Sequence, residues 1–207
     1  MPDVHVAPEL ASVIRPGSAT LDDLVVVERD ELQDEPLRAA AVAMRTAVES
    51  ADVTAAVRTM YKRVGIDPTK TRPSSEALLR RVRRGDELPR INSLVDVINW
   101  CSLESQLPFG LYDLDKVRGE VTLRLGLPGE EYAGIRKDAV HVAGRLTLAD
   151  DAGAFGNPTS DSARTMVTPA TTRALVVIFA PVSVPAATVE WALELTRRRA
   201  GKFCGAR

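Results

Sequence analysis

Apolar residues recur along the chain at two different spacings, and the spacing typical of helices dominates the first half. Residues 36–49 and 52–64 are rich in helix-forming residues. Pro36 suits the first turn of the first helix, and Gly65 is placed to end the second. We therefore expect two consecutive helices here.

A third helix is predicted over SSEALLRRVRRG, residues 74–85, with Gly85 at its end. At about 100° per residue, its apolar side chains fall on one side of the helix. These are Leu78, Leu79 and Val82. The opposite side holds Arg80, Arg81 and Arg84. Such a helix can bury one side and present several guanidinium groups on the other.

The segment LPRINSLVDVINW, residues 88–100, predicts a fourth helix with a rigid polar lead-in. Its apolar residues have helical spacing and include Leu94, Val97 and Ile98. Ser93 and Asp96 resemble a capping box, with Asp in place of the usual Glu. The structural interpretation of Asn92, in place of a role at a ligand, is an N-cap or a turn residue.

Strand patterns dominate after Pro108. Together with an earlier strand at 21–29, we expect strands at 120–127, 145–150, 163–168 and 174–180. The last of these is a continuous apolar run, as in a central strand. An amphipathic helix over 184–199 follows it. The pattern predicts one α+β domain over residues 1–207, with a mixed sheet, a core at about 20–200 and peripheral termini.

Composition agrees with a folded chain and excludes some functions. Apolar residues make up 45% and charged residues 27%, and the net charge is −1. That balance excludes a general binder of nucleic acid or anionic membranes. Residues 58–90, however, contain ten basic and four acidic residues, which suggests either one anionic partner or a solvated helix face.

Targeting signals are not evident in the sequence. The opening MPDVHVAPEL lacks the apolar centre of a signal peptide, and the longest apolar run, ALVVIFA, is far shorter than the about 20 residues of a membrane span. We expect a cytoplasmic monomer that binds neither membranes nor DNA.

Familiar catalytic signatures are missing, including phosphate-binding glycine loops and the nucleophile elbow. The two histidines, His5 and His141, have no metal-ligand spacing to each other or to the cysteines. Cys101 is expected to be a buried apolar residue and Cys204 to lie in a polar tail. We expect no metal and no cofactor.

Three polar clusters lie at the ends of predicted elements, where side chains are positioned and accessible. They are Arg72-Pro73-Ser74-Ser75-Glu76, Pro89-Arg90-Ile91-Asn92 and Asp161-Ser162-Ala163-Arg164-Thr165. Each also has a purely structural interpretation, as a helix start, a cap or an outward-facing strand. Composition and spacing alone leave both interpretations open.

In this order, RPSSEALLRR, LPRIN, LVDVIN and DLDKV resemble the B3/B4 domain of the phenylalanyl-tRNA synthetase beta chain. The similarity extends over most of residues 20–200, through DDAGAFGN and DSARTMVTPATTRALVVI, and is closest to freestanding proteins made of that domain. The resemblance implies an editing-type domain that binds tRNA or aminoacyl-tRNA and hydrolyses a mischarged ester in trans. A non-catalytic module for tRNA or an amino acid, and a scaffold with purely structural polar clusters, are the alternatives.

The resemblance also implies site residues. Arginines expected to meet tRNA phosphates are Arg72, Arg80, Arg81 and Arg84. Residues expected to line or order a substrate pocket are Ser74, Ser75, Glu76, Arg90, Asn92, Asn99, Asp113, Asp161, Ser162, Arg164 and Thr165. The chain departs from the synthetase pattern at two positions, with Gly110 where a His is common and Phe179 where an acidic residue is common. No catalytic residue is therefore assigned.

Overall fold

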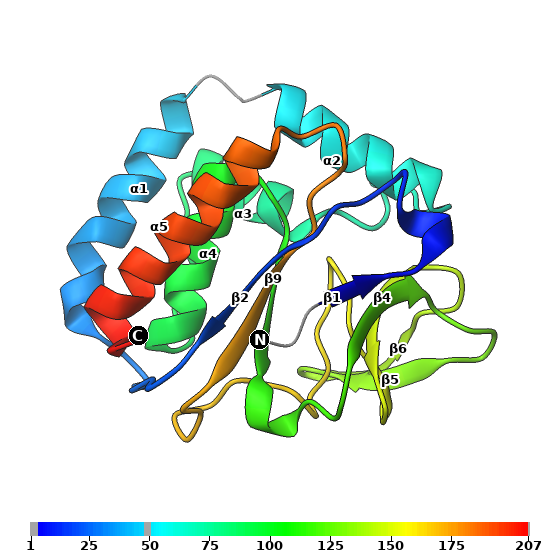
Figure 1. Ribbon diagram of the computed structural model, residues 1–207. Coiled ribbons are helices and arrows are strands. Elements are labelled where there is room, and N and C mark those ends of the chain that lie inside the picture. The colour runs from blue at the N-terminus through cyan, green and yellow to red at the C-terminus, as the bar shows by residue number, and fades with distance from the viewer. Residues whose placement is uncertain (1–3, 48–50, 207) are drawn as a thin grey trace.

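The computed structural model describes residues 4–47 and 51–206, and its architecture is α+β with a mixed sheet, as predicted. Figure 1 shows α1, α4 and α5 on one side of strands β2 and β9, with β1, β4, β5 and β6 on the other side. The helices are α1 (Asp34–Thr46), α2 (Ala51–Arg63), α3 (Ser74–Arg83), α4 (Ser93–Ser105) and α5 (Ala186–Cys204), with short 3-10 helices at Pro8–Leu10, Glu31–Gln33 and Leu114–Lys116.

Nine strands form three sheets within the described residues. They are β1 (Val4–Val6), β2 (Gly17–Leu21), β3 (Phe109–Asp113), β4 (Val121–Leu125), β5 (Glu131–Gly134), β6 (Lys137–His141), β7 (Leu146–Asp150), β8 (Gly153–Gly156) and β9 (Ala174–Ile178). The mixed sheet has the order β1-β4-β7-β8, with β1 parallel to β4. The other two are the antiparallel sheet β2-β9-β3 and the hairpin β5-β6.

The helix predictions are confirmed over the described residues, because helical periodicity is a local signal. Gly65 and Gly85 adopt φ of +74° and +95° two residues after the ends of α2 and α3, as expected of residues that end helices. Residues 48–49 of the predicted first helix lie outside the described residues. The α5 helix runs to Cys204, whose side chain is buried and not part of a polar tail.

The central-strand prediction for ALVVIFA is confirmed, since β9 pairs with strands on both sides and is fully buried. Strands at 120–127 and 145–150 are also confirmed, as β4 and β7.

Two strand predictions are wrong. Most of 21–29 is irregular because its main-chain hydrogen bonds reach the loop at Thr172 and the end of α5 at Cys204. Residues 163–165 form a bend and a turn and residues 166–168 are irregular, because the main-chain N–H groups of Arg164 and Thr168 donate to the side-chain hydroxyls of Ser162 and Thr171 rather than to a neighbouring strand.

Residues 4–19 contribute more to the core than a peripheral terminus would. Strand β1 pairs with β4, and Leu10 and Ile14 are almost completely buried. Helix α4 packs against β3, α3 and α5, so a single helix joins the helical part to the three-stranded sheet. Of the helices in the described ranges, each is too short or too polar to cross a bilayer.

Candidate functional site

A cleft of about 270 Å³ lies where α4, β3, the β5–β6 turn and the loop after β8 meet. Its walls are mostly apolar, and they are formed by Ile91, Val95, Ile98, Phe109, Leu111, Ile135, Met166 and Val167. Its polar groups come from Asn99, Arg136 and Asp161. A mostly apolar cleft with a few polar groups is the usual form of a small-ligand site.

Helix α4 positions one wall of this cleft. Asn92 caps the helix, because its Oδ1 accepts a hydrogen bond of 2.9 Å from the Val95 main-chain N–H. The cap is therefore Asn92, as one interpretation of the sequence had it, and not the Ser93 of the predicted capping box. Val97 and Cys101 face the core, and Val95 and Asn99 are left partly exposed on the side that borders the cleft.

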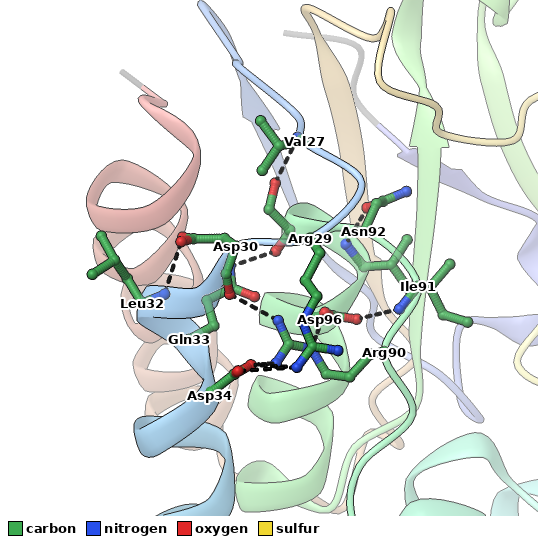
Figure 2. A network of polar contacts seen from close by, with 12 residues as sticks. Val27, Arg29, Asp30, Leu32, Gln33, Asp34, Arg90, Ile91, Asn92 and Asp96 are labelled. Carbon is green, nitrogen blue, oxygen red and sulfur yellow. Dashed lines mark hydrogen bonds and ion pairs between the residues drawn. The ribbon is translucent and has the colours of Figure 1, made fainter.

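Arg90 anchors the segment before α4 (Figure 2). Its Nε donates to Asp96 Oδ2 at 2.6 Å, and its Nη2 donates to the Asp30 main-chain oxygen at 2.9 Å. Its Nη1 also forms an ion pair with Asp34. Asp96 is 1% exposed and accepts a further hydrogen bond from the Ile91 N–H. These contacts fix Ile91 at the edge of the cleft.

Of the residues predicted to line a substrate pocket, Asn99 and Asp161 lie in the lining of this cleft, and their role as substrate-binding residues stays a prediction. Arg90 and Asn92 hold the start of α4 in place, so they act behind the cleft rather than in its lining. Their direct contact with a ligand stays a prediction.

The predicted cluster at residues 74–76 does not join this cleft. Ser74, Ser75 and Glu76 form the first turn of α3, the structural alternative that the sequence left open. Hydrogen bonds from Arg58 hold the pKa of Glu76 below its usual value. Glu76 therefore stays ionised at neutral pH.

The loop after β8 divides into buried and cleft-lining residues. Asp150 binds Arg164 through two hydrogen bonds of 2.9 and 3.0 Å, and Ser162 Oγ accepts from the Arg164 main-chain N–H.

Asp113 is buried and accepts from Thr171 Oγ1 at 2.8 Å. Thr165 is fully buried, and its Oγ1 has no partner in the described part of the chain. This scaffold supports Asp161, Met166 and Val167 in the cleft wall.

Asp161 has an unusual environment for a carboxyl group. Its Oδ1 accepts a hydrogen bond of 2.8 Å from the hydroxyl of Tyr112, which is fully buried. Burial raises the pKa of Asp161 to about 7, although the Tyr112 hydrogen bond acts in the opposite direction. A group that titrates near neutrality in a cleft is suited to proton transfer.

Sequence reasoning did not identify Arg136 or the apolar walls of the cleft. Arg136 lies in the β5–β6 turn with φ of +56°, a left-handed conformation that is uncommon for a residue other than glycine. The two strands that flank Arg136 were not predicted, so no signal in the sequence indicated that a turn places this residue at the cleft. The apolar wall residues, such as Phe109 and Leu111, had the same pattern as core residues.

Arg80, Arg83 and Arg84, at the end of α3 and directly after it, border a second, open surface depression. Arg80 and Arg84 are exposed, and neither side chain has a hydrogen bond or ion pair to another described residue. Arg81 donates to the Glu87 main-chain oxygen, and Arg72 pairs with Glu76 at 3.3 Å. No group of His, Cys, Asp and Glu in residues 4–47 and 51–206 is arranged to hold a metal ion.

Comparisons with known proteins agree with one another. Residues 56–194 match the B3/4 domain family. Phenylalanine--tRNA ligase beta subunits from Ralstonia nicotianae and Cutibacterium acnes are 32% identical over 74 residues and 35% identical over 85 residues. These matches cover 36% and 41% of this chain, and only 9% and 10% of the relatives.

A solved structure also matches this fold. It is an N-terminal fragment of the phenylalanyl-tRNA synthetase beta-subunit from Pyrococcus horikoshii. The match has a TM-score of 0.51 and 13% identity, and it covers 99% of this chain and 49% of that one.

Proposed function

The chain belongs to the B3/4 domain family, and on this premise we propose that it binds the aminoacyl end of tRNA and hydrolyses a mischarged ester in trans. Its relation to the phenylalanyl-tRNA synthetase beta subunit makes it a synthetase-associated type of domain. In this proposal the protein is a cytoplasmic monomer that works as a freestanding domain.

The single observation that supports this proposal best is the cleft between α4 and β3. Its volume of about 270 Å³ suits one amino-acid side chain with part of its ester, and most of its walls are apolar. Asn99 and Asp161 supply polar groups within hydrogen-bonding reach of a ligand in the cleft. Such a site discriminates substrates by leaving its polar groups unpaired when the wrong ligand binds.

Exposed arginines supply the contacts that a tRNA backbone requires. Arg136 lies at the cleft itself, where it can meet the terminal phosphates of the acceptor end. Arg80 on α3 and Arg84 directly after it add exposed positive charge at a second surface. Contacts of this kind give affinity that depends on salt and little on base sequence.

The proposed chemistry does not require a strong nucleophile. An aminoacyl ester is already activated toward attack, so a positioned water and donors to the developing oxyanion are sufficient. A cleft that fixes the side chain also fixes the ester carbonyl relative to that water.

The direct test incubates the purified protein with a panel of correctly charged and mischarged tRNAs and follows loss of the ester. The expected result is faster hydrolysis of one or a few mischarged species. Ester loss at the background rate for every pair would refute the enzymatic function.

A non-catalytic binding module is the second candidate, and the residues at 110 and 179 favour it. Position 110 is glycine, and Phe179 is completely buried in the core, so neither position offers a polar group to the cleft. Filter binding of uncharged and charged tRNA over a salt series distinguishes the candidates. Binding that falls steeply with salt, without ester loss, supports this second function.

A further inference from the structure

Asp161 is the one carboxyl group in the lining of the cleft, as far as the described residues show. It is partly exposed, and the wall around it includes Ile135, Met166 and Val167. A carboxylate in such surroundings loses much of its hydration, which favours the protonated form. The group is therefore poised to exchange a proton with a ligand or a water molecule in the cleft.

Tyr112 holds this carboxyl from behind. Its ring packs edge-on against Phe155 with centroids 4.9 Å apart, and its hydroxyl donates to Asp161 Oδ1. Burial raises the pKa of Tyr112 well above its usual range, so the hydroxyl stays protonated and remains a donor. With Oδ1 engaged, Oδ2 of Asp161 has no donor among the residues the structure describes.

Two glycines make room for the Tyr112 hydroxyl. A β-carbon at Gly110 would lie 2.7 Å from Tyr112 Cζ, and one at Gly156 would lie 2.6 Å from the same atom. No real side chain tolerates such distances without movement of its neighbour. The absence of a side chain at position 110 therefore allows the Tyr112–Asp161 hydrogen bond.

We propose that Asp161 is the general base of this cleft, that its Oδ2 activates the attacking water, and that Tyr112 positions it through Oδ1. This inference rests on the proposed ester hydrolysis and names the group responsible for it. Glu76 is excluded from the role because it lies outside the cleft and its carboxylate is paired with arginines.

The proton and bond changes balance without a further reactant. Oδ2 of Asp161 accepts a proton from water as the water oxygen bonds to the ester carbonyl carbon. The tetrahedral intermediate then collapses, the bond between the carbonyl carbon and the ribose oxygen breaks, and Asp161 returns the proton to that oxygen. The products are a free amino acid and a tRNA with an intact 3′-terminal ribose.

Burial raises the pKa of Asp161 and the Tyr112 hydrogen bond lowers it, and three titratable or charged groups face this carboxyl. Tyr112 from β3 donates to it, buried Tyr132 from β5 lies near enough to interact electrostatically, and Arg136 faces the same cleft. The base form is required for the reaction, so hydrolysis should rise with pH through about 7 and then level off.

The test uses the full chain and the mischarged tRNA that it hydrolyses fastest. Asp161→Asn keeps the shape of the side chain and should lower kcat at pH 8 by about 10²- to 10⁴-fold with little change in KM. Tyr112→Phe should move the midpoint of the pH profile upward, because it removes the hydrogen bond that lowers the pKa of Asp161. Tyr61→Phe is the matched control, since it removes a buried hydroxyl that binds Pro158 and Thr159 instead.

The outcomes separate this inference from the proposed function. Normal kcat in Asp161→Asn, or a change in KM alone, overturns the general-base role while leaving hydrolysis in place. Binding without hydrolysis of any charged tRNA overturns the same role and leaves a binding function. A protein that neither binds nor hydrolyses refutes both, and an unchanged pH midpoint in Tyr112→Phe refutes the positioning role.

Discussion

Replacing Arg90 with methionine tests whether the polar lead-in of α4 is structural. The substitution keeps much of the side-chain volume and removes the partner of Asp96, whose side chain is 1% exposed. Asp96 would keep the Ile91 N–H as a hydrogen-bond donor. The lead-in would also lose the links from Arg90 to Asp34 and to the Asp30 main-chain oxygen.

The expected loss of stability follows from these exposures. Removing one partner of a buried ion pair costs about 3–5 kcal/mol, and the 19% exposure of Arg90 favours the lower end, about 3 kcal/mol. For a chain of 207 residues this corresponds to a decrease in Tm of about 6–12 °C. Arg38→Met is the control, because Arg38 and Glu87 are 61% and 72% exposed and 3.7 Å apart, and such a pair contributes at most about 1 kcal/mol.

Urea unfolding followed by circular dichroism measures this difference directly. The midpoint of Arg90→Met should fall while the slope m stays the same, since the surface exposed on unfolding hardly changes. A loss below about 1 kcal/mol, or a loss equal to that of the control, would refute the structural assignment. Reduced tRNA binding with unchanged stability would instead assign Arg90 to the ligand.

Three further substitutions test neighbouring parts of the structure. Asn92→Ala removes the N-cap of α4 and should lower the free energy of unfolding by about 1 kcal/mol in the same urea assay, whereas an unchanged midpoint would contradict the cap. Gly110→Ala should displace the Tyr112 hydroxyl and cost about 1–3 kcal/mol by thermal unfolding, and wild-type stability would show that the ring moves freely. Asp161→Asn should become more stable relative to the wild type by roughly 1–2 kcal/mol as the pH rises from about 5 to 8. The reason is that the folded-state pKa is raised to about 7, so the stability from protonated Asp161 is lost as the pH passes that value; a pH-independent difference would contradict it.

Local signals in the sequence were sufficient for the helices and for the central strand. Leu94, Val97 and Cys101 recur at helical spacing, and a helix satisfies its own main-chain groups, so no distant partner has to be known. Strands need partners, and this is where prediction failed. Leu24 and Val26 are buried while Val25 and Val27 are exposed, as in a strand. The main-chain N–H groups of this segment nevertheless donate hydrogen bonds to a loop and to the end of a helix, and not to a neighbouring strand.

The site was only partly predictable for a related reason. Asn99 and Asp161 were expected at a pocket because of the resemblance to the synthetase domain, and both lie in the lining of the cleft. Phe109, Leu111 and Val167 line the cleft, but a cleft wall and a protein core have the same apolar composition. Tyr112 was missed because its importance depends on the hydroxyl reaching Asp161, 49 residues further along the chain.

The central claim is that the cleft between α4 and β3 receives the aminoacyl end of tRNA. Isothermal titration with a 3′-aminoacylamino-adenosine, a non-hydrolysable amide analogue of that end, tests it most directly. Ile91→Trp should fill the mouth of the cleft, since Ile91 lines it and is 45% exposed, and Leu127→Trp is the control at a site 56% exposed and outside the lining. The account predicts that the wild type and Leu127→Trp bind the analogue with similar affinity. The affinity of Ile91→Trp should be at least about 10-fold weaker, which corresponds to a loss of about 1.4 kcal/mol in binding free energy. Equal affinity in all three proteins, or no binding of any aminoacyl analogue to the wild type, would contradict the claim.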